Sequence, residues 1–180
     1  LFVYFDRRLR RRTVDEPEPD HEKPGGWENA LTEATAFYLS CDLSALAKVV
    51  EYVTGETEDP PVRIGTQARE PEGIPDLVIQ RQSGKRLIIE CKVDADLGDR
   101  QLERYLESLK RDRGHLALLS RRFQRVPESV LICRSIYRFP EGRDHFAWED
   151  LYTLVANAGS DSVSPLRNHF LRYLEWLGLE

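Results

Sequence analysis

The fold is decided by residues 73–93, which read GIPDLVIQRQSGKRLIIECKV. Gly73-Ile74-Pro75 predicts a turn that leads into a short strand over Asp76–Gln80. Ser83-Gly84-Lys85 is typical of a hairpin turn, and the apolar run after it predicts a strong strand over Arg86–Val93. The sequence therefore predicts two neighbouring strands joined by a short turn, which makes them antiparallel.

Side chains alternate between the two faces of a strand, so Arg86–Val93 divides into two sets. One face is wholly apolar and is expected in the core, with Leu87, Ile89, Cys91 and Val93. The other face carries Ile88, Glu90 and Lys92, which places a carboxylate beside an ammonium group. Because the hairpin is short, we expect Asp76 at the start of the preceding strand to meet Glu90 across the sheet.

The predicted meeting of two carboxylates defines the chemistry of this site. Two carboxylates in contact repel each other unless a cation lies between them. Hard oxygen ligands suit Mg²⁺ (or Mn²⁺), so Asp76 and Glu90 are the predicted metal ligands, with the backbone carbonyl of Cys91 as a further one. A bound metal activates water and stabilises charge on a phosphate. Lys92 is expected to orient that water and to offset developing negative charge.

These residues, Pro75-Asp76 and Glu90-Cys91-Lys92, resemble the motif of the PD-(D/E)xK nuclease superfamily. The resemblance covers the chain from about residue 28 to residue 137. It implies a restriction-endonuclease-like α/β core, with a central mixed β-sheet flanked by helices in the order αβββαβ and with extra N- and C-terminal helices. It also implies Mg-dependent phosphodiester hydrolysis, with Asp76, Glu90 and Lys92 as catalytic residues.

The same resemblance adds two candidate site residues, Gln101 and Glu28. Gln101 and Tyr105 lie four apart in a predicted helix, which is similar to the Q-x-x-x-Y element of phage-type and recombination exonucleases in this superfamily. In the family, a glutamate of the first helix often completes the acidic cluster. Glu28 is preferred over Glu33 for this role, because Glu28 lies one turn before Leu31 and so points nearer the core face.

Each of these residues also has a purely structural interpretation. Asp76 after proline fits a turn, and Glu90 with Lys92 fits a solvent-facing pair that contributes about 0.2–1 kcal/mol. Gln101 fits a surface amide beside a core tyrosine. Glu28 fits a favourable acid in the first turn of a helix.

The rest of the chain predicts helices and strands on both sides of the hairpin. In chain order we expect helices over Glu28–Cys41 and from an Asp42 cap to Gly55, a strand over Val62–Ala68, a helix capped by Asp99, a strand over His115–Ser120, a further strand within Ser129–Tyr137, and helices over Trp148–Ala156 and from Ser164 to about Gly178. Strands on either side of a crossover helix favour a mixed sheet with helices on both faces. We expect residues 1–26 to be an N-terminal stub and polar linker, and residues 27–180 to be the nuclease-like domain.

Bulk properties set the class of protein and its partners. The 180 residues are 41% hydrophobic and 32% charged, an ordinary globular mix. No apolar run approaches the roughly 18 residues that span a bilayer, and the start does not resemble a signal peptide, so a cytoplasmic setting and no membrane partner are expected. The four histidines and three cysteines lack metal-ligand spacing.

The net charge of −5 argues against tight nonspecific DNA binding unless basic residues cluster locally. Two groups of residues are candidates for phosphate contacts: Arg100, Arg104, Lys110, Arg111 and Arg113 on or after the crossover helix, and Arg121, Arg122 and Arg125 after the strand ending at Ser120. The alternative for the first group is a solvated helix face balanced by Glu103 and Glu107.

The leading hypothesis for function is metal-dependent phosphodiester cleavage, with DNA favoured over RNA as partner. The alternative is an inactive nuclease-like module that binds nucleic acid or a protein partner. A small-molecule enzyme lacks support, because the chain has no nucleophile elbow, dinucleotide loop or P-loop. The chain contains no methionine, and we expect a module of a larger bacterial protein, such as one for antiviral defence or restriction. A homodimer would ease the cutting of both strands.

Overall fold

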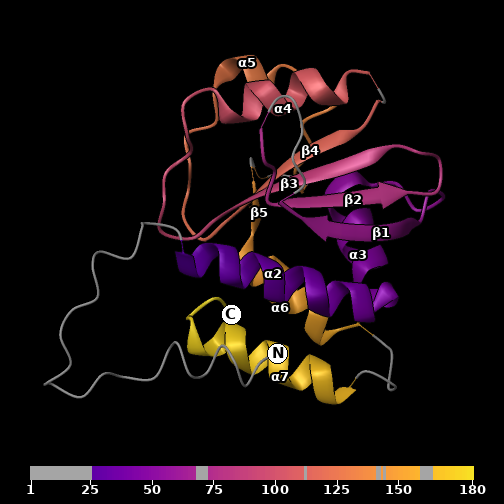
Figure 1. Ribbon diagram of the computed structural model, residues 1–180, viewed down its shortest axis with the longest axis vertical. Coiled ribbons are helices and arrows are strands. Elements are labelled where there is room, and N and C mark those ends of the chain that lie inside the picture. The colour runs from indigo at the N-terminus through magenta and orange to yellow at the C-terminus, as the bar shows by residue number, and fades with distance from the viewer. Residues whose placement is uncertain (1–25, 68–72, 112, 141–142, 144, 159–163) are drawn as a thin grey trace, which may run out of the picture.

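A five-stranded mixed sheet forms the centre of the computed structural model, which describes residues 26–67, 73–111, 113–140, 143, 145–158 and 164–180. Its elements are α2 (Gly26–Cys41), α3 (Leu43–Thr54), β1 (Pro61–Thr66), β2 (Leu77–Arg81), β3 (Arg86–Lys92), α4 (Gln101–Leu109), β4 (His115–Ser120), α5 (Glu128–Leu131), β5 (Phe146–Ala147), α6 (Trp148–Ala156) and α7 (Ser164–Trp176). Figure 1 shows α4 and α5 over one face of the sheet and α2 over the other. The expected α/β class, a mixed sheet flanked by helices, is confirmed.

The strands follow the order β1-β2-β3-β4-β5 in space. β1, β2 and β3 pair antiparallel, whereas β3, β4 and β5 pair parallel. The parallel pairing requires a crossover connection, which α4 supplies between β3 and β4. In register, Leu77 faces Ile89 and Lys92 faces Ser120. The start of β2 and the ends of β3 and β4 therefore lie at one end of the sheet, called here the site end.

The alternation of β3 divides the interior into two cores, as expected. Leu87, Ile89, Cys91 and Val93 pack in the core that includes residues of α2, α3, α6 and α7. Ile88 packs on the opposite face with residues of α4 and β4. Full burial of one such aliphatic side chain contributes about 1.5–3 kcal/mol. A slip of one residue would exchange the two faces of β3, so this burial fixes the register.

Local signals define the boundaries of α3, as predicted. Asp42 is the N-cap, and its Oδ1 accepts a hydrogen bond from the Ala45 N–H at 3.0 Å. Gly55 ends the helix with a φ of 70°, a conformation that glycine adopts without strain. The Tyr38 hydroxyl donates to Asp42 Oδ2 at 2.9 Å, and the Tyr38 ring stacks on Phe170 of α7 at 4.7 Å. The cap of α3 therefore also connects α2 with α7.

Two sequence predictions are wrong. The strand expected within Ser129–Tyr137 is replaced by the short helix α5, and only an isolated bridge joins Tyr137 to Leu116. The fifth strand is instead β5. The helix expected to be capped by Asp99 has Arg100 as its N-cap, with a φ of 50° and no side-chain capping bond.

Other boundaries differ by a few residues. β1 begins and ends earlier than expected, at Pro61 and Thr66, and α7 ends at Trp176. The predicted stub and linker lie outside the described residues, apart from residue 26, which begins α2. Within the described part of the chain, no helix is long and apolar enough to cross a membrane.

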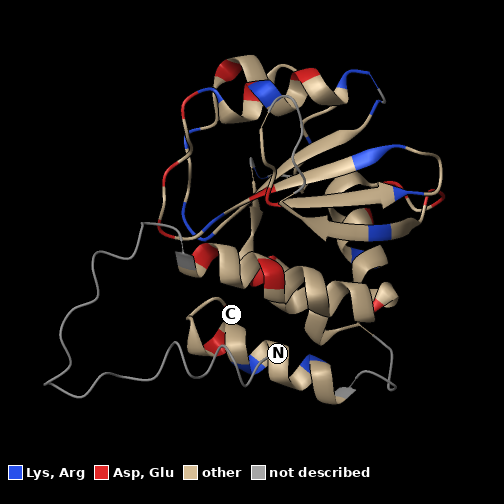
Figure 2. Cartoon of the chain, in the orientation of Figure 1, with Lys and Arg blue, Asp and Glu red and all other residues tan. Residues whose placement is uncertain are grey.

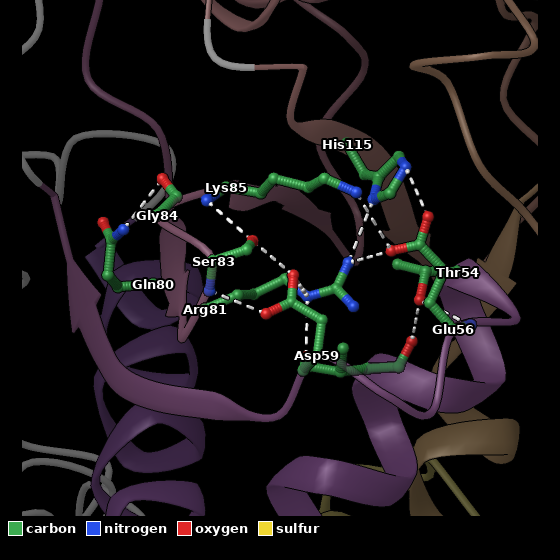
Figure 3. Close-up of polar contacts among 10 residues, drawn as sticks. Thr54, Glu56, Asp59, Gln80, Arg81, Ser83, Gly84, Lys85 and His115 are labelled. Atoms are coloured by element: carbon green, nitrogen blue, oxygen red, sulfur yellow. Dashed lines mark hydrogen bonds and ion pairs between the residues drawn. The ribbon is translucent and has the colours of Figure 1, made fainter.

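A cluster of polar side chains stabilises the end of the sheet opposite the site end (Figure 3). Arg81 Nη1 donates to Glu56 Oε2 at 2.6 Å, and Arg81 Nε donates to the Asp59 backbone oxygen at 3.0 Å. His115, at the start of β4, lies with its Nε2 3.6 Å from Glu56 Oε1. Because the Arg81 side chain is fully buried, loss of a partner would leave a buried charge, at a cost of about 3–5 kcal/mol.

Candidate active site

Asp76 and Glu90 meet at the site end of the sheet. Asp76 directly precedes β2, and its Oδ2 accepts a hydrogen bond from the Cys91 N–H at 2.8 Å. Because Cys91 follows Glu90 in β3, this bond holds the Asp76 carboxylate beside Glu90. The side chain of Cys91 is buried in the core on the other face. Its backbone carbonyl as a metal ligand stays a prediction.

Glu90 is the most constrained member of the site. It is 1% exposed, and its Oε1 accepts hydrogen bonds from Lys92 Nζ at 2.6 Å and from Gln101 Nε2 at 2.7 Å. Its other carboxylate oxygen, Oε2, is buried and has no hydrogen-bond partner among the described residues. A buried polar atom without a partner is costly, and this oxygen keeps its capacity to accept a donor or a cation.

The electrostatics of the site follow from burial and from the neighbouring charges. Burial, followed by the charge of Asp76, raises the pKa of Glu90 to about 8, against the opposing effect of Lys92. Burial by itself lowers the pKa of Lys92, but the Glu90 and Asp76 carboxylates outweigh it and leave that pKa raised. Lys92 therefore stays an ammonium group, whereas a second negative charge at Glu90 is disfavoured without a further cation.

Helix α4 orients the site through Gln101 and Tyr105. Gln101 Oε1 accepts a hydrogen bond from the Gly98 N–H at 3.1 Å, which directs the amide nitrogen toward Glu90. The Tyr105 hydroxyl donates to the Ile74 backbone oxygen at 3.0 Å, in the turn that precedes Asp76. The two residues of the predicted Q-x-x-x-Y element thus contact β3 and the turn that precedes β2.

The same turn explains why a glycine stands before Ile74. Gly73 has a φ of 146°, and a Cβ at this position would lie 3.2 Å from Cε1 of Tyr105. A side chain here would therefore be strained and crowded against the ring. Gly73 allows the turn to approach α4 closely, which fixes where β2 begins.

Glu28 lies in the first turn of α2 and holds the loop that follows β3. Its Oε1 accepts hydrogen bonds from the N–H groups of Val93, Asp94 and Ala95, at 2.8, 3.0 and 3.1 Å. Glu33 is exposed. In the described residues, no group of three or more His, Cys, Asp or Glu side chains is arranged to hold a metal. The structure thus gives Glu28 a positioning role, and its role in an acidic cluster stays a prediction.

Two residues at the site were not predicted from the sequence. Ser120 faces Lys92 in the parallel register, is fully buried, and its hydroxyl has no hydrogen-bond partner among the described residues. Trp148 Nε1 donates to the Lys92 backbone oxygen at 3.0 Å. The apolar run before Ser120 predicted the strand, but its register against β3 depends on the length of the crossover and could not be derived locally.

The predicted basic groups differ in their position. In the first group, Lys110 forms an ion pair with Glu107, which favours the interpretation as a solvated helix face. In the second group, Arg121 follows the end of β4 directly and its N–H donates to the Lys92 backbone oxygen at 3.1 Å. The second group therefore lies at the site end of the sheet.

No protein-family model matches this chain, and no curated protein matches it. A similar solved structure is the crystal structure of a repair endonuclease from Pyrococcus abyssi, at 19% sequence identity and a TM-score of 0.36. The match covers 71% of this chain and 50% of that one, so the chain spans about half the length of the similar structure. At this similarity the match carries no argument about activity. Any argument about activity rests on the arrangement of Asp76, Glu90 and Lys92.

Proposed function

We propose that this chain is a metal-dependent nuclease of the PD-(D/E)xK type, which hydrolyses phosphodiester bonds in DNA in preference to RNA. One observation carries the proposal. Glu90 is buried beside Asp76, its Oε2 has no partner among the described residues, and Lys92 and Gln101 hold its Oε1. Burial and the charge of Asp76 both disfavour the ionised form of Glu90, and a cation bound between the two carboxylates would offset both effects.

The donor atoms fit a hard divalent cation. Asp76 and Glu90 supply carboxylate oxygens, whereas the Cys91 side chain lies in the opposite core. Carboxylates together with water and phosphate oxygens are the ligand set that Mg²⁺ prefers, and Mn²⁺ accepts the same set. When bound, the cation lowers the pKa of a water ligand and stabilises charge on the scissile phosphate.

The other side chains of the site orient the reacting groups and neutralise negative charge. Lys92 has a 12% exposed side chain, so its ammonium group reaches the surface of the site while it contacts Glu90. In this position it orients the attacking water and offsets negative charge that develops on the phosphate. Gln101 fixes the rotation of the Glu90 carboxylate, which leaves Oε2 for the ligand. Glu28 shapes the loop beyond Lys92 through its bonds to three backbone N–H groups.

The biological setting is part of the proposal and derives from the family resemblance. We propose that the chain acts as a module of a larger bacterial protein for antiviral defence or restriction, with dimerisation as the route to cutting both strands. The competing function is a module without activity that binds nucleic acid or a protein partner. A cleavage assay in the presence of metal separates the two functions.

The test is a cleavage assay with supercoiled plasmid, linear duplex DNA, single-stranded DNA and RNA, each with Mg²⁺, Mn²⁺ or EDTA. We expect metal-dependent cutting that falls by at least about 100-fold in Lys92→Ala and in Asp76→Asn. Lys110→Ala changes an exposed lysine that also pairs with a glutamate, and it should cut at the wild-type rate.

Three outcomes of this assay would contradict or change the proposal. Cutting at the wild-type rate by both Lys92→Ala and Asp76→Asn would contradict the assignment of the site. Binding of nucleic acid by wild-type protein without cutting in either metal would favour the inactive module. Faster cutting of RNA than of DNA would reverse the substrate preference but keep the reaction.

A further inference from the structure

The connection from β4 to α5 begins with residues 121–125, which leave the sheet beside Lys92. The Arg121 N–H donates to the Lys92 backbone oxygen at 3.1 Å, and Gln124 Nε2 donates to the Ala95 backbone oxygen at 3.3 Å. In Figure 1 this connection and the one from β3 to α4 run from the same end of the sheet toward α4 and α5. Residues 121–125, called here the arginine loop, are therefore tethered to the strand end that carries Lys92.

The arginine loop is strongly basic for its length. Three of its five residues are exposed arginines, Arg121, Arg122 and Arg125. Asp94 lies 4.0 Å from Arg121 Nη1 and 3.7 Å from Arg122 Nη2, and Glu149 lines the same pocket as both arginines. Figure 2 shows acidic and basic segments along these two connections. Long ion pairs at the surface are weak, so both guanidinium groups remain available to a phosphate.

Phe123 stands in the middle of the arginine loop and is 70% exposed. The ring of His145 is its described neighbour, at 6.5 Å between centroids and steeply inclined. Phe123 therefore contributes little to either core. An exposed aromatic ring between arginines is the arrangement on which bases stack in proteins that bind single strands. A base within a duplex has both faces covered by its neighbours, so this ring favours an unpaired base.

We propose that the arginine loop binds single-stranded nucleic acid beside the active site, with Arg121 and Arg122 on phosphates and Phe123 against an unpaired base. The proposal rests on the proposed function and deepens it, because it names the form of nucleic acid that the site receives. That form is a single strand or an unpaired segment of a duplex. The net charge of −5 makes nonspecific attraction over the whole surface unfavourable, so binding depends on this local group of cations.

The test measures binding separately from cleavage. The full chain in EDTA is titrated against a fluorescein-labelled single-stranded oligonucleotide and against the same oligonucleotide annealed to its complement, with anisotropy giving Kd at several salt concentrations. We expect tighter binding of the single strand. Phe123→Ala should weaken it by about 5- to 100-fold, whereas Phe123→Trp should keep it near the wild-type value. Arg122→Ala should weaken binding of both oligonucleotides and reduce the salt slope for the single strand by about 0.7.

Matched controls come from the edge strand β1, outside the arginine loop. Val62 and Arg63 are exposed there, so Val62→Ala and Arg63→Ala should bind both oligonucleotides as wild type does. Phe123→Ala with unchanged affinity would overturn the proposal and assign the exposed ring to a protein partner. Wild-type protein that binds neither oligonucleotide, or that prefers the duplex, would also overturn it.

The failure of this proposal is distinguishable from the failure of the proposed function. Wild-type protein that binds the single strand through Phe123 but cuts nothing would contradict the nuclease assignment alone. Wild-type protein that cuts, with rates and affinities indifferent to Phe123→Ala, would contradict the arginine-loop proposal alone.

Discussion

Gln101 Nε2 donates to Glu90 Oε1 at 2.7 Å, so the first residue of α4 fixes the orientation of a carboxylate buried in β3. The two oxygens of that carboxylate therefore differ. Oε1 accepts hydrogen bonds from two donors, whereas Oε2 has no partner among the described residues. A metal ligand needs such fixation, because its orientation decides how well it reaches the ion.

Replacement of Gln101 should therefore impair metal binding more than folding. In Gln101→Ala we expect Mg²⁺ affinity, measured by calorimetry, and the cleavage rate to fall by about 10- to 100-fold. The free energy of unfolding should change by less than about 1.5 kcal/mol, because the exposed Gly98 N–H that loses its acceptor is hydrated and Glu90 Oε1 keeps the bond from Lys92. Gln80→Ala removes an amide that donates to the Gly84 backbone oxygen in the hairpin turn, and it should leave metal affinity intact. Equal metal affinity in both variants would contradict the positioning role of Gln101.

Asp76→Asn should separate stability from function. The amide oxygen can still accept the bond from the Cys91 N–H, while the repulsion that acts on Glu90 is removed. In EDTA we expect a Tm at least as high as that of the wild type. Addition of Mg²⁺ should raise the Tm of the wild type, because the ion binds the folded state, and should leave Asp76→Asn unchanged. An equal Mg²⁺-dependent rise in both proteins would exclude Asp76 as a metal ligand.

The cluster around His115 should make the fold sensitive to acid. Burial lowers the pKa of His115 to about 4, Arg138 and Arg81 also lower it, and Glu56 opposes them. In the unfolded chain the pKa of histidine is near 6.5, so the unfolded state binds more protons as the pH falls from about 6.5 to about 4. The stabilising contribution of neutral His115 is therefore complete above pH 6.5 and is lost as the pH falls toward 4.

The Glu56 carboxylate also contributes stability that is lost on acidification, at a lower pH than the contribution of His115. Burial by itself raises the pKa of Glu56, but the bond from Arg81 and the neighbouring positive charges outweigh this and lower it. Glu90 contributes in the opposite direction over the same pH range, because its pKa is raised in the folded state, so the contribution of His115 is measured as a difference between two proteins. In urea unfolding at pH 7.5 and pH 5, the free energy of unfolding of the wild type should fall by about 1–2 kcal/mol relative to that of His115→Asn. His169→Asn, at an exposed position of α7, should behave as the wild type does. The same pH dependence in His115→Asn and in the wild type would contradict this account.

Ser120→Ala tests a buried hydroxyl whose benefit to the fold is not apparent from its contacts. Ser120 Oγ has no hydrogen-bond partner among the described residues, so its removal should leave the free energy of unfolding unchanged or raise it by about 1 kcal/mol. We expect the cleavage rate to fall nonetheless, because the hydroxyl faces the position of Lys92 in the sheet and can bind a water there. Ser40→Ala, at an exposed position of α2, is the matched control. Wild-type cleavage by Ser120→Ala would assign Ser120 to packing alone.

Much of the site was predictable because its parts are local in the sequence. Alternation along β3 put Glu90 and Lys92 on one face, and the short hairpin put Asp76 beside them. The four-residue spacing of Gln101 and Tyr105 put both on one side of a helix. The structure bears out these placements through the bonds that join Asp76 to Cys91 and Gln101 to Glu90.

Other features could not be derived from local patterns. The segment after Pro127 has the composition of a strand, yet it forms α5, because Val130 packs into the core beneath α4 and tertiary packing overrides a short propensity. The two-residue strand β5 is too short to leave a periodic signal. The role of Glu28 in the acidic cluster stays a prediction, and its three hydrogen bonds to N–H groups beyond β3 depend on how α2 packs against the sheet.

The sequence by itself determined the hairpin, the two faces of β3 and the residue types that meet at its end, because alternation and turn chemistry act within a few residues. Only the tertiary structure decided that Ser120 faces Lys92 and that Glu90 is buried enough for its pKa to rise to about 8. Register across a crossover and the desolvation of a charge depend on how distant elements pack, and packing is a property of the whole fold.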